Sequence, residues 1–450
     1  MGLEDQGPLD IAVIGTGISG MASAWLLSRR HRVTVYEEAP RLGGHTNTVD
    51  AVMDGVRHPV DTGFIVYNEP CYPNLTALFK HLDVPTKASV MSFAVSLDDG
   101  KLEYAGSSLN TLFAQRRNLF DRRFWSMIRD LLRFYKEAPS LVDSAGSISL
   151  GAYLTRQRYG AAFRDDHLLP MVAAIWSAPA KTLLDYPAEA FVRFCENHGL
   201  LKISDRPQWR TVVGGSRAYV ARLTARYADR IRLSCGARRI VRTDRGVDVT
   251  DASGQTLGFD HIVIAAHADQ ALAMLGDPSP AEADLLGAFR YERNLAYLHS
   301  DPSLMPKRRA VWSSWNYLGR RGPAIENRLC VTYWMNELQS FAAAKPLFVT
   351  LNPEQPPRPE TIFHEEAYDH PIFTCDALAA QRKLWSLQGQ RGTWYCGAYF
   401  GAGFHEDGLQ AGLAVAEALG GVRRPWTVEG ESARITLGGV REPALAGAAE

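Results

Sequence analysis

The residues best suited to chemistry in this chain are the glycines of a turn that follows an apolar run near the N-terminus. Residues 11–20 read Ile-Ala-Val-Ile-Gly-Thr-Gly-Ile-Ser-Gly, a strand pattern that leads into G-x-G-x-x-G. Gly15 allows a sharp turn, Gly17 leaves room for a pyrophosphate, and Gly20 lets the next helix pack closely on its strand. The start of that helix supplies free N–H groups and the positive end of a dipole. The pattern predicts a dinucleotide site.

The residues around the turn agree with this interpretation. Residues 21–28 favour a helix, and residues 32–36 alternate as a second strand does, with Glu37 at its end. Glu37 lies 17 residues beyond Gly20, close to the offset of about 20 expected for the acid that binds ribose hydroxyls. The alternative, an accidental glycine turn, explains neither the helix nor the acid.

A second glycine pair indicates which dinucleotide binds. Residues 41–45 read Arg-Leu-Gly-Gly-His. With Glu37 before it, this stretch resembles the flavin amine oxidase and carotenoid desaturase superfamily, whose signature is Glu followed by Arg-x-Gly-Gly-Arg. The resemblance implies non-covalent FAD, with Arg41, Gly43 and Gly44 at the pyrophosphate. His45 stands where relatives carry arginine, so the role of that arginine is not transferred.

Later stretches complete the nucleotide-binding domain. Residues 212–216 form a Gly-Gly turn before a helix at 217–227, and residues 231–241 are interpreted as a strand on the adenine side. Residues 247–250 and 255–259 form a hairpin, and residues 261–266 a buried strand that ends in a small-residue turn. The cofactor-binding residues expected from motif and resemblance are Gly15, Gly17, Ile18, Ser19, Gly20, Glu37, Glu38, Arg41, Gly43, Gly44, His45, Gly63, Phe64, Ala237, Arg238, Ala265, Ala266, Gly397, Asp407, Gly408 and Leu409.

A glycine-rich loop near the C-terminus leads into a helix expected at 409–419, with Asp407 as its N-cap. In the superfamily this helix start points its N–H groups at the flavin edge where negative charge gathers on reduction. Gly408 and Leu409 take that place here. Ala398 replaces the acid that commonly holds the ribityl chain in relatives.

Oxidation of a carbon chain by a flavin needs a weakened C–H bond beside the ring and a base for a second proton. His405 and Glu406 are the candidate bases near the predicted flavin edge, with Tyr399 and His299 in reserve. The alternative for residues 405–407 is a solvated polar loop that caps the helix.

Composition is consistent with an enzyme of two intertwined domains, since the 450 residues are 46% hydrophobic and carry a formal net charge of zero. Balanced charge argues against nucleic acid as a partner. No apolar stretch of about 18 residues and no signal peptide is present, and the six cysteines are scattered without C-x-x-C. We expect a cytoplasmic protein, placed at the inner face of the membrane where it meets lipid, with reduced buried thiols and no metal site.

The predicted fold is α/β with α+β inserts: a Rossmann-like FAD-binding domain intertwined with a substrate domain of helices and a mixed sheet, amine-oxidase-like. Residues 9–88, 208–268 and 385–423 form the FAD-binding domain. Residues 89–207 and 269–384 form the substrate domain, and residues 424–450 a C-terminal tail whose structure the sequence leaves open.

The two inserts should build the substrate chamber. The first is mostly helical and contains, at residues 116–136, a helix dense in arginine with apolar residues at helical spacing. Such a helix is typical of an element that contacts an anionic membrane surface; the alternative is a domain helix that packs its apolar stripe on the core. The second insert is rich in aromatic residues, and runs at 310–317 and 328–335 suggest strands over an apolar tunnel.

The second half of the chain also resembles one branch of the superfamily. Its stretches at 299–301, 312–317, 351–353, 368–371 and 404–408 recur in bacterial flavoproteins often encoded beside methyltransferases that resemble cyclopropane fatty acid synthase. The resemblance implies a desaturase that acts on methyl-branched unsaturated acyl chains of membrane phospholipids, on the route to furan fatty acids, with a methyltransferase as partner. Alternatives are an amine oxidase with Tyr399 and Trp315 as an aromatic cage, a redox-neutral fatty-acid double-bond isomerase that uses FAD, and a flavin-binding chaperone of the methyltransferase.

Overall fold

The computed structural model describes residues 7–142, 148–176, 184–321 and 330–438. A five-stranded parallel sheet with the order β10-β2-β1-β14-β20 begins the fold. Its central strands are continuous apolar runs because both faces of the sheet are covered. Their bounds are β1 Asp10–Ile14, β2 Arg32–Tyr36, β10 Ile231–Arg232, β14 His261–Ile264 and β20 Thr393–Tyr395.

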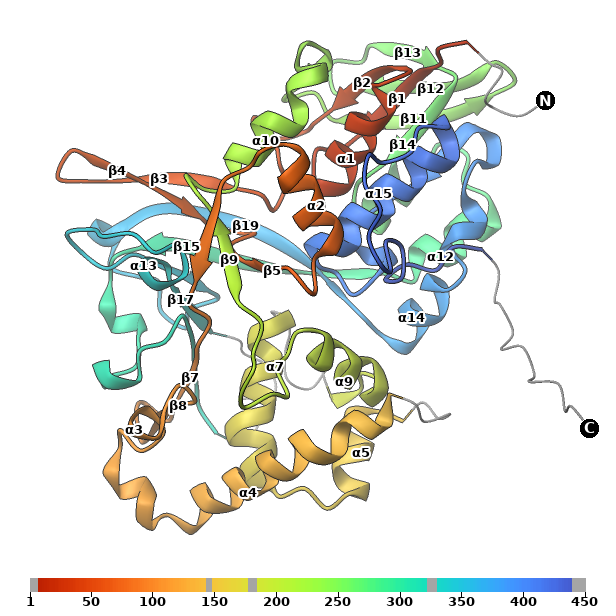
Figure 1. Cartoon of the computed structure of the whole chain (residues 1–450). Helices are drawn as coiled ribbons and strands as arrows, with labels where there is room; N and C mark the ends of the chain where they lie inside the picture. The colour runs from red at the N-terminus through yellow and green to blue at the C-terminus, as the bar shows by residue number, and fades with distance from the viewer. Residues whose placement is uncertain (1–6, 143–147, 177–183, 322–329, 439–450) are drawn as a thin grey trace, which may run out of the picture.

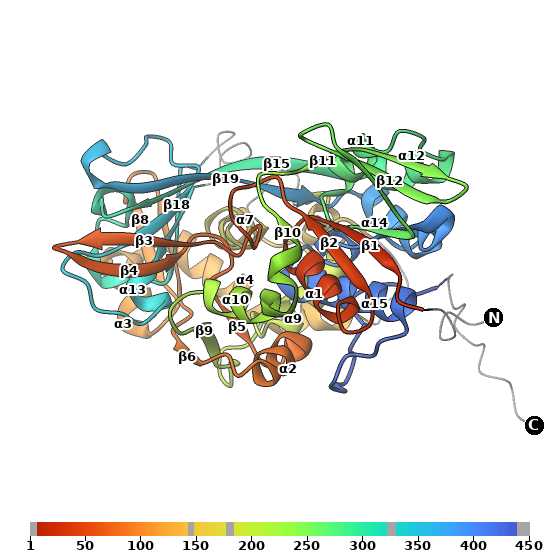
Figure 2. The same ribbon diagram turned by 90° about the horizontal axis from the view of Figure 1, so that it is seen from above.

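Two helices, α1 (Ile18–Leu27) and α15 (His405–Gly420), pack side by side on one face of this sheet (Figure 1). Their axes can come close because Gly412 has no side chain. A Cβ at this position would lie only 2.2 Å from the Ser19 carbonyl oxygen. The antiparallel sheet of β11 (Ala237–Thr243), β12 (Gly246–Asp251) and β13 (Thr256–Phe259) lies on the opposite side (Figure 2). The predicted hairpin at 247–259 is confirmed by β12 and β13.

A seven-stranded mixed sheet, β19-β15-β18-β17-β16-β7-β8, forms the second layer of the molecule. Its strands are β7 Phe93–Leu97, β8 Leu102–Ala105, β15 Arg290–His299, β16 Trp315–Gly319, β17 Val331–Trp334, β18 Phe348–Leu351 and β19 Ile362–Ile372. The predicted strands at 310–317 and 328–335 are confirmed in part, and Arg328 lies outside the described residues. The first insert is less helical than expected, since β7 pairs in parallel with β16 and extends the sheet.

A group of helices forms the end of the molecule away from the parallel sheet (Figure 1). It contains α3 Leu109–Leu112, α4 Arg122–Glu137, α5 Leu150–Arg156, α6 Ala161–Phe163, α7 Leu169–Trp176 and α9 Ala188–Asn197. The carboxylate of Asp121 caps α4 and accepts hydrogen bonds from the backbone N–H groups of Arg123 and Phe124 at 2.8 and 3.4 Å. One face of α4 is buried through Phe124, Met127 and Phe134.

The remaining elements connect these layers. They are the hairpin β3 Thr48–Met53 and β4 Val56–Asp61, the small sheet of β5 Tyr67–Asn68, β9 Trp209–Val212 and β6 Thr86–Ser89, and the helices α2 Pro73–His81, α10 Arg217–Thr224, α11 Ala268–Met274, α12 Pro280–Gly287, α13 Met335–Leu338 and α14 Cys375–Gln381.

The predicted strand at 231–241 is two strands in different sheets. β10 ends at Arg232 and β11 begins at Ala237, and the chain changes sheets between them. Gly236 permits this change because it has no side chain, whereas a Cβ there would lie only 2.9 Å from Glu38 Cβ. A continuous apolar pattern does not reveal such a switch, since both segments are strands.

The described part of the C-terminal tail, residues 424–438, packs against the nucleotide-binding helices. Arg424 Nε donates to Glu417 Oε1 at 2.7 Å, and its Nη1 donates to Asn74 Oδ1 at 2.9 Å. The Trp426 ring stacks on Trp25 with centroids 5.8 Å apart. The tail thereby holds α15 against α2; residues 439–450 lie outside the described residues.

Among the described residues, no helix is both long and apolar enough to cross a membrane. All six cysteines are free thiols. The expectation of buried thiols is wrong for Cys375, which is exposed at the start of α14.

Candidate active site

A large cavity extends from the turn between β1 and α1 to helices α3 and α4. Its volume is about 1820 Å³, well above the roughly 300–1,000 Å³ of an ordinary ligand pocket. It therefore has room for a dinucleotide and a substrate together.

The glycine turn shapes one end of this cavity. Gly15 has φ +95°, and a Cβ there would lie 2.7 Å from the Ala265 carbonyl oxygen. A Cβ at Gly17 would instead point into open space, which is where a pyrophosphate needs room. Helix α1 has Gly17 as N-cap and no side-chain cap, so its first N–H groups face the cavity without a side-chain partner.

The carboxylate of Glu37 lies at the end of β2, beside this turn. Its Oε2 accepts hydrogen bonds from the N–H and the hydroxyl of Thr16, and its Oε1 accepts from the Ala39 N–H at 2.8 Å. Oε1 keeps an acceptor site for a ribose hydroxyl. The glycine cradle and this acid together fit FAD.

Most of the predicted cofactor residues line the cavity. They are Gly15, Gly17, Ile18, Ser19, Glu37, Glu38, Gly43, Gly44, His45, Gly63, Phe64, Ala237, Arg238, Ala265, Ala266 and Gly397. Ala398, which stands in place of the acid of relatives, also lines it.

Five predicted cofactor residues do not line the cavity. A Cβ at Gly20 would lie 2.0 Å from the Gly15 carbonyl oxygen, so this glycine serves close packing. Gly408 does the same for the contact of α15 with Ile18, where a Cβ would lie 2.9 Å from Cγ2. Leu409 is fully buried in the core. The other two, Arg41 and Asp407, hold the walls of the site in place.

Arg41, which was predicted to bind the pyrophosphate, does not line the cavity. Its Nη1 donates to the Gly44 carbonyl oxygen at 2.7 Å, and its Nη2 lies 3.5 Å from Glu366 Oε2. The side chain therefore fixes the second glycine turn against β19.

Helix α15 begins at His405, four residues before the predicted start, and its N-cap is Phe404. Asp407 is therefore in the first turn, where its Oδ2 accepts from the Phe404 N–H at 2.7 Å. Its Oδ1 lies 3.3 Å from Arg434 Nη1 of the tail. Asp407 is therefore not the N-cap residue that was predicted, although its carboxylate still caps the helix by accepting the Phe404 N–H.

Glu406 is not a base in the chamber. It is fully buried and absent from the cavity wall, and its carboxylate accepts from the N–H groups of Asn74 and Leu75 at 3.0 Å each. The side-chain amides of Asn74 and Gln410 donate to the same carboxylate at 2.8 and 3.1 Å. Glu406 thus caps α2 and joins it to α15, which corrects the prediction.

His405 does line the cavity. Its ring stacks on Phe64 with centroids 3.9 Å apart, and its Nε2 lies 2.6 Å from the Tyr219 hydroxyl. Burial lowers the pKa of His405 to about 3. The imidazole is therefore neutral near pH 7, and because its Nε2 meets the Tyr219 hydroxyl and its ring face is covered by Phe64, it suits a wall of the flavin site better than proton abstraction.

The two reserve bases differ in position. Tyr399 lines the cavity, and its buried hydroxyl has no partner among the described residues. Burial raises the pKa of Tyr399 well above its ordinary value, so the phenol donates and does not abstract a proton. His299 is fully buried between Thr350 and Asp301 and lies off the cavity, so its predicted role is wrong. Trp315 and Tyr399, proposed as an amine cage, both line the cavity, where the Trp315 ring packs on Tyr333 and the Tyr399 ring on Phe289.

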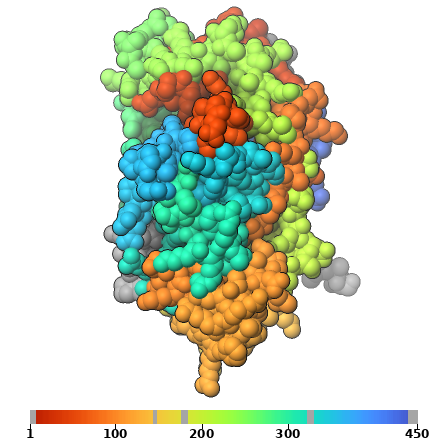
Figure 3. Space-filling view, turned by 90° about the vertical axis from the view of Figure 1, so that its left-hand side faces the viewer, coloured from red at the N-terminus to blue at the C-terminus, as the bar shows by residue number. Residues whose placement is uncertain are grey.

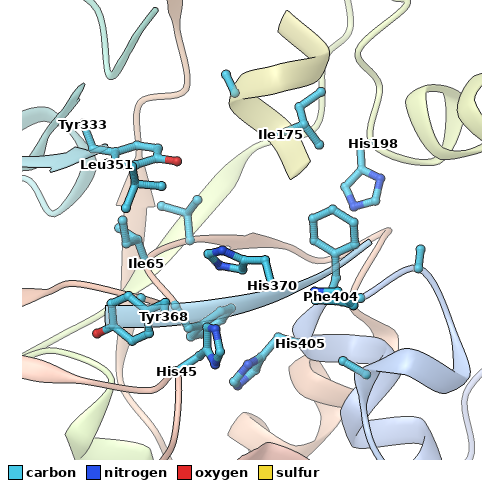
Figure 4. Close-up of a pocket in the computed structure, with 18 of the residues that line it drawn as sticks. His45, Ile65, Ile175, His198, Tyr333, Leu351, Tyr368, His370, Phe404 and His405 are labelled. Carbon is cyan, nitrogen blue, oxygen red and sulfur yellow. The ribbon is translucent and has the colours of Figure 1, made fainter. Parts of the chain in front are cut away.

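Sequence reasoning predicted His45 as a cofactor residue but missed its two neighbours on the cavity wall, Tyr368 and His370 of β19 (Figure 4). The His45 ring lies 5.0 Å from Tyr368 and 5.2 Å from His370, centroid to centroid. Tyr368 and His370 alternate on β19 with Asp369 between them, a period that could have placed both on one face. Only their place in a family-like stretch was noted.

A chain of amides fixes the proton on His370. The Leu295 N–H donates to Asn352 Oδ1 at 2.8 Å, so Asn352 Nδ2 donates to Asn294 Oδ1 at 2.6 Å. Asn294 Nδ2 then donates to His370 Nδ1 at 2.8 Å. Neutral His370 must therefore carry its proton on Nε2, and burial lowers its pKa to about 4.

The rest of the chamber is mostly apolar, with a few serine, glutamine and histidine side chains among its lining residues. Side chains from several elements line it, namely Ile65, Val66, Met91, Phe93, Leu112, Met127, Ile128, Leu131, Met171, Ala174, Ile175, Phe194, Leu200, Trp209, Leu351, Phe373 and Phe404. Charged lining residues are few: Glu37, Glu38 and Arg238 at the dinucleotide end, Asp369 on β19, and Arg206 at the far end.

Solved structures with the same fold act on different substrates. Cyclohexylamine oxidase from Brevibacterium oxydans IH-35A has a TM-score of 0.67 and 18% identity, covering 92% of this chain and 99% of that one. A fatty acid isomerase from P. acnes that produces CLA has a TM-score of 0.62 and 15% identity, with 90% and 97% covered. These similarities show the fold alone.

Sequence comparison is more specific. The model of flavin-containing amine oxidoreductases matches residues 18–303. A putative flavin-containing monoamine oxidase, AofH, from Mycobacterium tuberculosis (strain CDC 1551 / Oshkosh) is 26% identical over 284 residues, which are 60% of this chain and 59% of the relative. This chain thus has an amine-oxidase-like fold and belongs to the family of flavin-containing amine oxidoreductases.

Proposed function

We propose that this enzyme dehydrogenates an apolar acyl chain, specifically a methyl-branched unsaturated fatty acyl chain of a membrane phospholipid. The observation that carries the proposal is the chamber itself, whose wall between the glycine turns and α3 and α4 is mostly aliphatic and aromatic. Aliphatic and aromatic walls exclude water and hold a hydrocarbon chain by burial alone. The resemblance of the stretches at 299–301 and 404–408 supports the methyl-branched substrate.

Dehydrogenation breaks two C–H bonds and forms one C=C bond. Bound FAD supplies the acceptor for one hydrogen with its electron pair, and the second hydrogen leaves as a proton. The chain places neutral imidazoles of His45 and His370 on the wall at this end of the chamber. Because neutral His370 holds its proton on Nε2, we assign to this N–H the role of a hydrogen-bond donor that orients bound groups. We assign the role of proton acceptor to His45, which is neutral because burial keeps its pKa well below the usual value.

Anaerobic mixing of the flavin-loaded enzyme with substrates tests the proposal. We expect a methyl-branched unsaturated phospholipid to bleach the yellow flavin, and polyamines to leave it yellow. Product formed without bleaching supports double-bond isomerisation, the kind of activity that the P. acnes fatty acid isomerase is named for, and bleaching by amines alone contradicts the proposal.

A variant pair ties the result to the chamber. Ile175 lines the cavity, so Ile175→Trp places a larger side chain in the space for the acyl chain. The variant should raise KM for the lipid at least tenfold while flavin content stays unchanged. Val213→Trp is the matched control, because Val213 is exposed and lies off the cavity. Equal lipid kinetics in both variants would show that the acyl chain does not use this chamber.

A further inference from the structure

The far end of the cavity opens among α3, α4 and the segment 200–207. Three large apolar side chains there line the cavity and are also exposed: Leu109 at 75%, Leu132 at 47% and Ile203 at 70%. Exposed apolar side chains at a cavity mouth mark an interaction surface when they gather in one place. We call these three residues, with Leu119, Phe120 and Trp125, the rim.

The other rim residues continue along the same segment. Phe120 is 89% exposed, the largest fraction among the described large apolar residues, and Trp125 is 47% exposed. The Trp125 ring lies 5.5 Å from Phe113, which ends α3, so the two helices meet at the rim. Trp125 and Leu132 are seven residues apart and share one face of α4.

Helix α4 therefore has two apolar faces. Phe124, Met127 and Phe134 are buried against the protein, while Trp125 and Leu132 are exposed. The sequence left open whether α4 packs its apolar residues on the core or contacts a membrane surface. One apolar face does pack on the core, but the exposed apolar residues lie on another face.

Positive charge surrounds the rim. Residues 116–137 contain seven basic and three acidic residues, a net charge of +4 in a chain whose net charge is zero. Arg116, Arg122, Arg129 and Lys136 are exposed, and Lys202 and Arg206 are exposed across the opening. Of the acids, Asp121 caps α4 and Asp130 is buried against Gly160, while Glu137 and Asp205 are exposed.

This segment forms the tapered end of the molecule in the space-filling view (Figure 3), opposite the parallel sheet. An end that presents both apolar and cationic side chains is complementary to a surface with acyl chains below and anionic groups above.

We propose that the rim docks on the surface of an anionic phospholipid bilayer, so that an acyl chain passes from the bilayer into the chamber without crossing water. The rim side chains enter the acyl boundary and the surrounding cations contact lipid phosphates. The route of the acyl chain rests on the proposed function, whereas the docking itself does not.

Vesicle co-sedimentation of the flavin-loaded enzyme tests docking without any turnover. We expect binding to vesicles of phosphatidylglycerol and phosphatidylcholine, and little binding to phosphatidylcholine alone. Each neutralised cation near the bilayer should weaken binding about fivefold. The triple variant Arg116→Gln, Arg122→Gln, Arg129→Gln should therefore bind roughly 100-fold more weakly.

Matched variants separate the rim from general charge and hydrophobicity. Leu109→Asp with Ile203→Asp should abolish binding, whereas Val56→Asp with Arg57→Gln, exposed on the β3–β4 hairpin, should leave it unchanged. Brominated lipids should quench the tryptophan fluorescence of the enzyme and do so less in Trp125→Phe. Failure to bind anionic vesicles, or binding that survives the rim variants, overturns the proposal; docking without flavin bleaching by lipid overturns only the proposed function.

Discussion

At the scale of single residues, the most consequential position is Gly17, because the space beside it belongs to the cofactor. Gly17→Val should abolish retention of FAD while the fold persists, since its Cβ meets no protein atom within 4 Å. The flavin-to-protein ratio after gel filtration measures the effect, and circular dichroism reports folding. Gly106→Val is the control, because Gly106 lines the far end of the cavity with equally open space. Normal flavin content in Gly17→Val would contradict the site.

The tautomer of His370 is a second residue-scale property that can be tested. Asn294→Asp replaces an amide donor with a carboxylate, which accepts a proton from Nδ1. The pKa of His370 should then rise by about 1–3 units from its low value, because a nearby negative charge favours imidazolium. Nitrogen-15 NMR of labelled histidine follows both tautomer and titration. Asn294→Ala removes the donor without adding charge and should leave the pKa low; an unchanged titration in Asn294→Asp would argue against the amide chain.

At the scale of elements, Glu406 determines how α2 and α15 meet. Its carboxylate accepts hydrogen bonds from two backbone N–H groups of α2, so Glu406→Ala leaves buried donors without a partner. We expect a loss of about 2–4 kcal/mol in the free energy of unfolding. Urea unfolding of the flavin-loaded enzyme measures it, with exposed Glu429→Ala as control. If stability is retained and turnover is lost, Glu406 is a catalytic base after all.

The elements that bind the dinucleotide were the most predictable part of the molecule. The G-x-G-x-x-G turn is local, so spacing alone places Gly15 and Gly17 between β1 and α1. The elements that join across long sequence distances were not predictable in this way. Arg41 reaches β19 and Glu406 reaches α2, and no local pattern records those partners.

The substrate end shows the same limit. The arginine-rich helix was visible in the sequence, but its two apolar faces depend on what packs against it. Only the tertiary structure shows that Phe124 is buried and that Trp125 beside it is exposed. His370 was likewise one polar residue in a strand until pairing of β19 with β15 placed it beside Asn294.

At the scale of the whole molecule, two layers of sheet and a group of helices share one cavity, so its polar wall residues are buried far from water. Burial lowers the pKa of several histidines: to about 4 for the wall residues His167 and His370 and for His299, which is buried off the cavity, and to about 3 for the wall residues His198 and His405. In the unfolded chain the same groups titrate near 6.5. Between these values the unfolded state binds protons that the native state does not.

The fold should therefore lose stability as pH falls from about 6.5 to about 4, and each neutral imidazole should contribute up to about 1.4 kcal/mol per pH unit in that window. Above pH 6.5 neither state binds these protons, so the contribution is fully present there. Urea unfolding of the flavin-loaded enzyme at steps between pH 7.5 and pH 4.5 measures the slope. Since His299 lies off the cavity, His299→Gln should make the slope shallower by about 1.4 kcal/mol per pH unit without loss of flavin, whatever it does to stability at pH 7. Val213→Gln, at an exposed site and without any titratable group, should leave the slope as it was. A slope that is flat in the parent enzyme would mean that these imidazoles are solvated and that the walls of the chamber admit water, and equal slopes in the two variants would mean that the His299 imidazole is solvated.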